Sequence, residues 1–438
     1  MRSALTLLAL GIVSTSAIGE VERYELENGA VVILDPVEGV GSVAVIAAYD
    51  TGSSDDPAGA PQAAHLAEHL RCTSATASWD TGVSYARLNE LGGANAETLA
   101  GFTYYDYVLP PKHLELALRV ESERLGSLEI TPADIAREGP RAAGELTGLD
   151  ASPGRYVGKF ALAGVTQGWT HNAAHVNLQT ALGEMPIGSL RQILERHTTT
   201  NLTLIVAGDF ELEHARQLID ATIGALQEGE APLEPVAIDW ATQPATRRMT
   251  WDARTRVVVV ACPAPEDQAT RAVLTGLGQI AHMTCNSIEG VLSLHTSGQT
   301  APVGEAPFHV LAAINDDADP DRVIEAIHDR LDALASSAPL YKTQLLGLLR
   351  EPPRPDVDQL RAQVAALARM RSMSEQRAMG LAIGNMALQT LMRERMGGEQ
   401  ARHAISTMSA DQLRQAAANA LSRDKRRVTI LKPHGQGP

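Results

Sequence analysis

Two histidines and a glutamate occur at metal-binding spacing in the run His65-Leu66-Ala67-Glu68-His69. On an α-helix each residue turns by about 100°, so His69 lies one turn beyond His65, with Glu68 close to both. Two imidazoles four residues apart can bind one metal ion, with a carboxylate beside the ion's open position. The order H-x-x-E-H is a recognised zinc-peptidase signature. A solvated helix face could carry the same residues, so the motif needs support from elsewhere in the chain.

A catalytic zinc site needs a third protein ligand and leaves its fourth position to water. Glu145 lies 76 residues after His69, and Glu138 precedes Glu145 by seven residues, which is about two helical turns. This combination resembles the pitrilysin/insulysin family of zinc peptidases, which includes the mitochondrial processing peptidase. In that family a distal ligand and a further glutamate occur at about these positions relative to the first motif.

A second segment, residues 91–98 followed by Thr103-Tyr104-Tyr105, looks like the G-G-x-x-N-A-x-T segment of the same family. The resemblance implies an edge strand that pairs with the backbone of a bound peptide, with Asn95 and Ala96 contacting the substrate. An asparagine at an ordinary turn or strand end is the alternative. Further similarity covers most of the chain, in the segments 24–34, 201–210, 408–413 and 427–433.

The resemblance and the chemistry together assign His65, His69 and Glu145 as zinc ligands and Glu68 as the general base. Zinc acidifies a bound water and polarises a peptide carbonyl, while Glu68 accepts a proton and returns it to the leaving amine. Glu138 is a candidate for contacting a zinc-binding residue on the side away from the metal, which would hold that residue in its orientation. Its position is open, because Gly139-Pro140 could end a helix between it and Glu145.

The second half of the chain departs from the family. Many members carry an arginine and a tyrosine there that hold the substrate backbone, whereas residues 272–321 contain no Arg, Lys or Tyr. Some short-chain relatives divide these functions between two subunits, so this chain resembles the zinc-bearing subunit of such a pair. The leading hypothesis is a zinc endopeptidase that acts on peptides or unfolded segments with a homologous partner. A noncatalytic subunit for assembly or peptide binding is the alternative, and homodimers remain possible.

These residues must be positioned by an α+β fold. The resemblance implies two homologous-looking domains, each a mainly antiparallel sheet packed with helices, enclosing a chamber. We expect a signal peptide over 1–19, a zinc-bearing domain over 20–225, a linker over 226–249 and a diverged domain over 250–438. Apolar spacing predicts helices over 213–226 and 360–396, and Asn28-Gly29 predicts a hairpin turn.

Composition limits the class of protein. The chain has 438 residues, and its net charge of −15 argues against nucleic acid as a partner. Arg2, an apolar run to Val13 and the small residues Thr15-Ser16-Ala17 are typical of a secretory signal, which indicates a periplasmic or secreted protein. A buried N-terminal helix or an uncleaved anchor is the alternative. No other stretch is long and apolar enough to span a bilayer. A disulfide between Cys262 and Cys285 is possible, whereas Cys72 fits a small packed residue.

Overall fold

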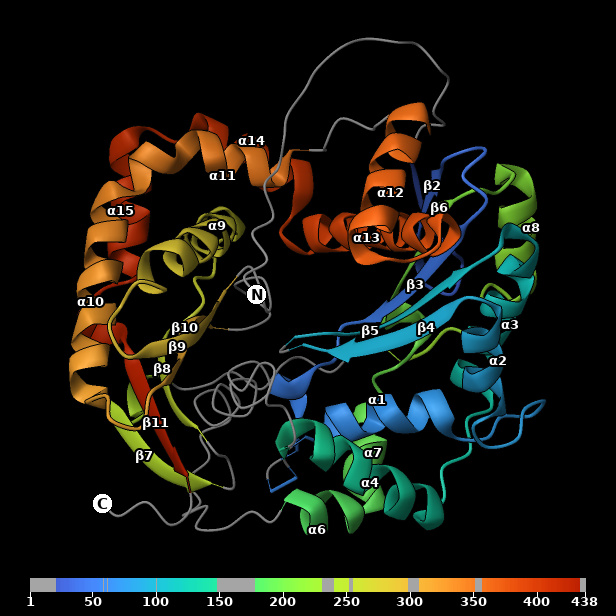
Figure 1. The fold of residues 1–438 in the computed structure, drawn as a ribbon, viewed down its shortest axis with the longest axis horizontal. Helices are drawn as coiled ribbons and strands as arrows, with labels where there is room; N and C mark the ends of the chain where they lie inside the picture. The colour runs from blue at the N-terminus through green and yellow to red at the C-terminus, as the bar shows by residue number, and fades with distance from the viewer. Residues whose placement is uncertain are drawn as a thin grey trace.

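The protein consists of two α+β halves that pack side by side, as the computed structural model shows (Figure 1). The structure describes residues 21–57, 59–60, 62–99, 101–147, 178–230, 240–251, 255–297, 307–350 and 357–433. The expected signal peptide, the middle of the expected linker and residues 148–177 lie outside this part. Within the described residues, no helix combines the length and the hydropathy that crossing a membrane requires.

Each half is built on one mainly antiparallel sheet, and the two sheets repeat the same strand order. The first sheet runs β1-β2-β6-β3-β5-β4 and the second runs β7-β11-β8-β10-β9. In both, a parallel pair (β2–β6 or β7–β11) is followed by three antiparallel pairs. The expected fold class, two similar α+β domains, is therefore confirmed. The strands are β1 Glu22–Glu25, β2 Val31–Pro36, β3 Val43–Tyr49, β4 Gly93–Thr98, β5 Thr103–Leu109, β6 Leu202–Gly208, β7 Thr246–Trp251, β8 Arg256–Cys262, β9 Val291–Thr296, β10 Phe308–Ile314 and β11 Arg427–Pro433.

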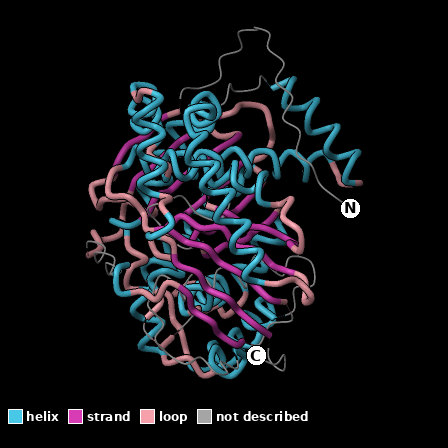
Figure 2. The backbone as a smooth tube through the Cα atoms, turned by 90° about the vertical axis from the view of Figure 1, so that its left-hand side faces the viewer, coloured by secondary structure: helices cyan, strands magenta, loops and turns pink. Residues whose placement is uncertain are grey.

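Helices cover both faces of each sheet, so β3 and β10 are buried at every residue. Figure 2 shows the strands in the middle of the molecule with helices around them. In the first half the described helices are α1 Ala63–Thr73, α2 Val83–Leu91, α3 Leu114–Gly126, α4 Pro132–Thr147, α6 Leu178–Gly183, α7 Ile187–Leu194 and α8 Leu212–Ala221. In the second half they are α9 Gln268–Cys285, α10 Pro320–Ser337, α11 Lys342–Leu349, α12 Val357–Arg371, α13 Glu375–Arg395, α14 Gly398–Thr407 and α15 Ala410–Ala420.

Each sheet is covered on one face by helices of its own half and on the other face by helices of the other half, an arrangement called here the exchange of helices. One face of the first sheet packs against its own α3 and α8, and the other face packs against α12 and α13 of the second half. The second sheet packs against its own α9, α10 and α15 on one face and against α1, α4, α6 and α7 on the other. Residues of β8 alternate between these two layers, with Val258 on the first face and Val257 on the second. The helix that carries the H-x-x-E-H motif is therefore part of the contact between the halves.

Several element boundaries differ from the sequence prediction. The helix expected over 213–226 ends at Ala221, and the chain then turns so that the Gly224 N–H donates to the Ile219 carbonyl oxygen at 2.9 Å. A side chain on Gly224 would meet the Asp220 carbonyl oxygen at 2.8 Å. The helical stretch expected over 360–396 is divided at Ser372, whose φ of 52° is left-handed, and the Ser374 side chain caps the second helix.

Two further observations concern the expected linker and the cysteines. β7 starts at Thr246, inside the stretch expected as a linker over 226–249, and pairs with β11. The predicted hairpin turn at Asn28-Gly29 joins β1 to β2, with Gly29 at a φ of 82°. Cys262 and Cys285 are buried free thiols, so the possible disulfide is not formed, and Cys72 is buried as expected.

Candidate metal centre

The helix α1 positions three residues of the proposed site. Its N-terminus follows Gln62, a left-handed residue with a φ of 65°. The buried Asp56 carboxylate accepts hydrogen bonds from the backbone N–H groups of Gln62 (2.6 Å) and Ala64 (2.7 Å), which caps the helix from outside. Apolar residues of α1, including Leu66, pack against the second sheet. Polar side chains are buried on the remaining faces, so each of them needs a partner.

His65, His69 and Glu145 converge as the sequence predicts. His65 Nε2 lies 3.4 Å from Glu145 Oε2, and His69 Nε2 lies 3.5 Å from Glu145 Oε1. Both imidazoles are largely buried, whereas the Glu145 side chain is 47% exposed. Within the described residues, these three form the group whose ligand atoms lie within 4.8 Å of one another and could bind a metal ion.

Glu138 and Glu145 share one continuous helix, α4, which resolves the ambiguity left by Pro140. The helix continues through Pro140, and Glu138 Oε2 lies 3.8 Å from His69 Nδ1. This separation is that of an ion pair and exceeds a hydrogen bond. At Gly139 a Cβ atom would lie 2.5 Å from the backbone of Leu182, so the glycine permits close packing of α6 against α4. The helix α6 therefore packs directly on α4 next to Pro140. The sequence alone did not decide whether α4 continues through this proline.

Electrostatic coupling between these groups shifts their pKa values. Burial lowers the pKa of His69, but Glu138, Glu145 and Glu68 outweigh it and raise that pKa to about 9. The two histidines hold the pKa of Glu145 well below its usual range. Burial raises the pKa of Glu138, yet His69 and two neighbouring arginines lower it to about 2. The carboxylates are thus ionised at neutral pH, which suits a site for a cation.

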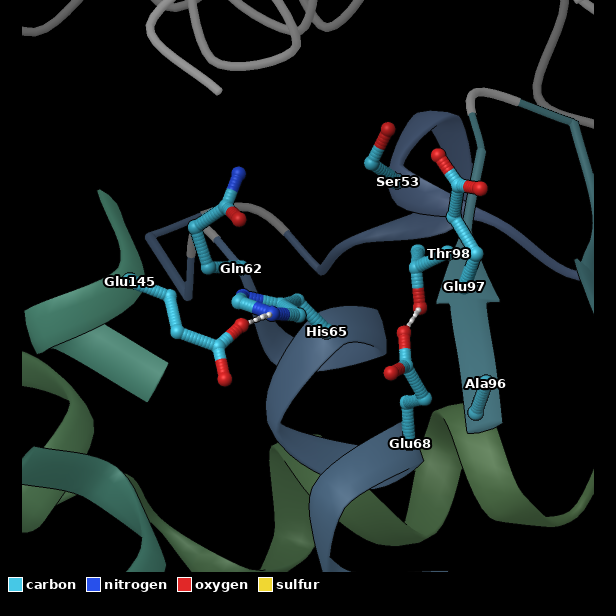
Figure 3. Close-up of a pocket in the computed structure, with 8 residues that line it drawn as sticks. All are labelled: Ser53, Gln62, His65, Glu68, Ala96, Glu97, Thr98 and Glu145. Atoms are coloured by element: carbon cyan, nitrogen blue, oxygen red, sulfur yellow. Dashed lines mark hydrogen bonds and ion pairs between the residues drawn. The ribbon is translucent and has the colours of Figure 1, made fainter. Parts of the chain in front are cut away.

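Glu68 faces the end of the edge strand β4. Its Oε2 accepts a hydrogen bond of 2.6 Å from the buried Thr98 hydroxyl (Figure 3). Thr98 ends the segment 91–98 that the sequence analysis singled out, but no role was assigned to it there. A pocket next to these groups is lined by Ser53, Gln62, His65, Glu68, Ala96, Glu97, Thr98 and Glu145.

The two predicted substrate residues occupy the outer strand of the first sheet, as the expected edge strand requires. Ala96 lines the pocket, whereas Asn95 is exposed and pairs in register with Asp106 of β5. The other edge of β4 has no strand partner within the described residues. At the start of that edge, side chains of α2 engage Ala94, whose N–H donates to Asn89 Oδ1 (3.2 Å) and whose carbonyl oxygen accepts from the Tyr85 hydroxyl (3.2 Å).

The sequence did not predict a buried network of charged and hydroxyl groups that begins at Arg71 of α1. Arg71 Nη1 donates to the Arg124 carbonyl oxygen (2.9 Å), and Arg71 Nη2 donates to the Tyr49 hydroxyl (2.7 Å) and to Glu121. Tyr107 also donates to Glu121 at 2.6 Å. The sequence carried one signal, a charged residue two positions after His69 on the predicted helix. Tyr49 lies 22 residues from Arg71, and Glu121 and Arg124 lie 50 and 53 residues from it, so these partners were not predictable from spacing.

The donor set fits a zinc ion. Zinc bonds nitrogen and oxygen at about 2.0–2.1 Å, so neighbouring donors of a tetrahedral site lie about 3.4 Å apart. Each histidine has one Glu145 oxygen at about this distance, Oε2 at 3.4 Å from His65 and Oε1 at 3.5 Å from His69. Glu138 faces the second nitrogen of His69, and a carboxylate in this position orients a metal-binding imidazole. Two histidines and a carboxylate form a recognised set for catalytic zinc.

Comparison with known proteins identifies the fold. No family model and no curated protein matches the sequence. A protease from Helicobacter pylori matches with a TM-score of 0.63 and 16% identity, over 95% of this chain and 100% of its own. The peptidase M16 inactive domain from Pseudomonas fluorescens gives 0.56 and 16%, over 96% and 99%. Pitrilysin gives 0.57 and 16%, over 95% of this chain and 45% of pitrilysin.

The chain therefore has a fold similar to that of M16 peptidases, as the resemblance implied. The same fold occurs in a protease and in a domain described as inactive. Fold alone does not decide between these two, so function depends on the side chains of this chain.

Proposed function

We propose that this protein is a zinc-dependent metalloendopeptidase of the H-x-x-E-H type that hydrolyses peptides or unfolded segments. The observation that carries the proposal is the convergence of His65, His69 and Glu145, whose ligand atoms lie within 4.8 Å of one another. Glu68 lies one residue from His69 on the same helix and lines the same pocket. An assembly protein would have no use for this additional carboxylate.

In this proposal, zinc binding, proton transfer and the orientation of His69 are carried out by different residues. Zinc, when bound by His65, His69 and Glu145, supplies an acidified water and polarises the scissile carbonyl. Thr98 occupies Oε2 of Glu68, which leaves Oε1 to accept a proton and return it to the leaving amine. Glu138 would orient His69 from behind.

The substrate would bind along β4. The outer edge of β4 would add the substrate as a further strand next to Ala96, and Asn95 would contact it from the rim. Main-chain pairing of this kind favours extended or unfolded segments over folded proteins.

We further propose that a homologous partner subunit supplies the arginine and tyrosine that residues 272–321 lack. A periplasmic or extracellular location follows if residues 1–19 are a cleaved signal peptide. The second candidate function, a noncatalytic peptide-binding subunit, is favoured by that missing pair and by the inactive domain of similar fold.

The test compares wild type with Glu68→Gln and His69→Ala. Zinc is measured by elemental mass spectrometry, and cleavage of a mixed peptide library is followed with each protein alone and with a co-purifying homologue. We expect about one zinc per chain in wild type and Glu68→Gln, cleavage in wild type only, and loss of zinc in His69→Ala. Zinc without cleavage in either setting would favour the noncatalytic subunit. Absence of zinc from wild type would refute the metal centre.

A further inference from the structure

Gln62 lines the pocket, and the proposed chemistry gives its side chain no role. The residue is only 1% exposed, and no described residue accepts a hydrogen bond from its side-chain nitrogen, which is buried. Buried donors without an acceptor are rare in folded proteins, because they cost free energy. Figure 3 shows this side chain beside the His65 imidazole and across the pocket from Glu68 and Thr98. Gln62 therefore brings an amide with two N–H donors to the pocket.

The backbone of Gln62 is held in a conformation that is unfavourable for its residue type. Its φ of 65° is left-handed, a conformation that residues other than glycine rarely adopt. The buried Asp56 carboxylate fixes this conformation, because it accepts hydrogen bonds from the N–H groups of Gln62 (2.6 Å) and Ala64 (2.7 Å). The Gln62 carbonyl oxygen accepts from the Leu66 N–H (2.9 Å) in the first turn of α1. Glycine would make the same backbone contacts without strain, so the side chain of Gln62 needs a separate explanation.

The proposed reaction calls for a hydrogen-bond donor in this pocket. Peptide cleavage places negative charge on the carbonyl oxygen of the scissile bond, and a donor aimed at that oxygen lowers the barrier. The eight described lining residues include three glutamates and no lysine or arginine. Of the two lining hydroxyls, Ser53 donates to a backbone carbonyl oxygen (3.4 Å) and Thr98 donates to Glu68 (2.6 Å). Since His65 is assigned to the metal, Gln62 is the remaining described lining residue with a side-chain donor.

We propose that Gln62 donates a hydrogen bond to the carbonyl oxygen of the peptide bond held in the pocket and stabilises the negative charge that develops there. Gln62 precedes His65 by three residues, about one helical turn, so its amide lies within reach of a carbonyl group beside the metal ligands. This inference rests on the proposed peptidase function. The hydrogen bond itself, however, forms whether or not the peptide is cleaved.

The experiment measures binding to the full-length, zinc-loaded Glu68→Gln protein by isothermal titration calorimetry. The probe is a six-residue peptide of alanine, serine and valine in which a phosphinic group replaces the central amide. This anionic tetrahedral group resembles the carbonyl group under attack, and the unmodified peptide is the reference. Both affinities are measured again after Gln62→Met, which keeps the length of the side chain and removes its donors, and after Gln62→Gly, which accepts the left-handed backbone. The matched control is Gln363→Met, at an exposed position of α12.

We expect both Gln62 variants to bind the phosphinic peptide about 100-fold more weakly, the effect of losing one such donor, and the reference peptide with an affinity changed by less than about threefold. Gln363→Met should change neither affinity. Zinc content should stay the same in all variants, because the Gln62 amide contacts no described metal ligand through a hydrogen bond. With Glu68 intact, Gln62→Met should lower kcat by a similar factor and leave KM nearly unchanged.

An unchanged affinity of both Gln62 variants for the phosphinic peptide would overturn the inference. Loss of zinc from both variants would also overturn it, because the side chain would then support the metal helix instead. Failure of the phosphinic peptide to bind before any change at Gln62 would have the same meaning. Cleavage by wild type with an unchanged phosphinic affinity in the variants would leave the peptidase function standing without this role. Binding that depends on Gln62 without any cleavage would refute the peptidase function and leave the hydrogen bond standing.

Discussion

Substitution of Glu121 by glutamine should destabilise the protein strongly, because this carboxylate balances buried positive charge. Glu121 is 0% exposed and accepts hydrogen bonds from Tyr49 and Tyr107, both at 2.6 Å, and from Arg71. Arg124, which is also buried, donates to the Tyr107 hydroxyl at 2.6 Å. Glutamine keeps the shape of the side chain but removes the negative charge that balances two buried guanidinium groups within the described residues.

The magnitude follows from the burial. Removing one partner of a buried ion pair typically costs about 3–5 kcal/mol, out of a total free energy of unfolding of about 5–15 kcal/mol. Urea unfolding followed by circular dichroism at neutral pH measures the change. The control is Glu115→Gln, an exposed position on the same helix α3, where we expect a change below about 0.5 kcal/mol. A loss of less than about 1 kcal/mol in Glu121→Gln would refute the argument that the network is held together by this charge.

Glu121 also predicts how the free energy of unfolding changes with pH. Burial raises the pKa of Glu121, but Arg71 and Arg124 outweigh it, so the pKa in the folded protein lies below its ordinary value. A carboxylate with a lowered pKa stabilises the fold above its unfolded pKa of about 4.3, and that contribution is lost as the pH falls through the folded value. Wild type should therefore lose more stability than Glu121→Gln on acidification below about pH 4.3. Parallel stability curves for the two proteins would contradict this assignment.

Three further predictions concern single side chains. Burial lowers the pKa of His197 to about 3, so stability should fall as the pH drops from about 6.5 towards 3, and His197→Phe should reduce this slope in urea unfolding measured at several pH values. Thr98→Val should reduce peptide turnover about tenfold or more with zinc content unchanged, whereas Thr98→Ser should retain turnover; equal rates would refute the role of the hydroxyl in holding Glu68. Gly139→Ala should cost about 2 kcal/mol or more, because its Cβ would overlap the α6 backbone, while Gly144→Ala on the same helix has no atom within 4 Å and should be neutral or stabilising.

The candidate site was predictable from sequence to the extent that its geometry is local. Helical spacing alone places His65, Glu68 and His69 together, and the family-like segments supplied Glu145 and the edge strand. Glu138 could not be placed, because the effect of Pro140 depends on how α4 packs against α6. The Thr98 bond to Glu68 joins residues 30 positions apart and needed the structure.

The fold shows the same division between local and distant interactions. The family-like segments 24–34, 201–210 and 427–433 contain strands of the two sheets, and the repeated strand order matches the expected duplication. Helix ends were less well predicted, because a left-handed residue such as Ser372 has no strong signature in its sequence. The exchange of helices between the halves was not predicted, since an apolar face does not specify which sheet it covers.

Because of this exchange of helices, the first sheet and the helices that cover one of its faces are synthesised at different times. The first sheet is complete at Gly208, but one of its faces is covered by α12 and α13, which end only at Arg395. At a synthesis rate of about 5–20 residues per second, the helices that cover this apolar face are completed about 10–40 s after the last strand of the sheet. If the sheet formed during that interval, its apolar face would be exposed to water, whereas folding after the end of translation would bring the sheet and its covering helices together.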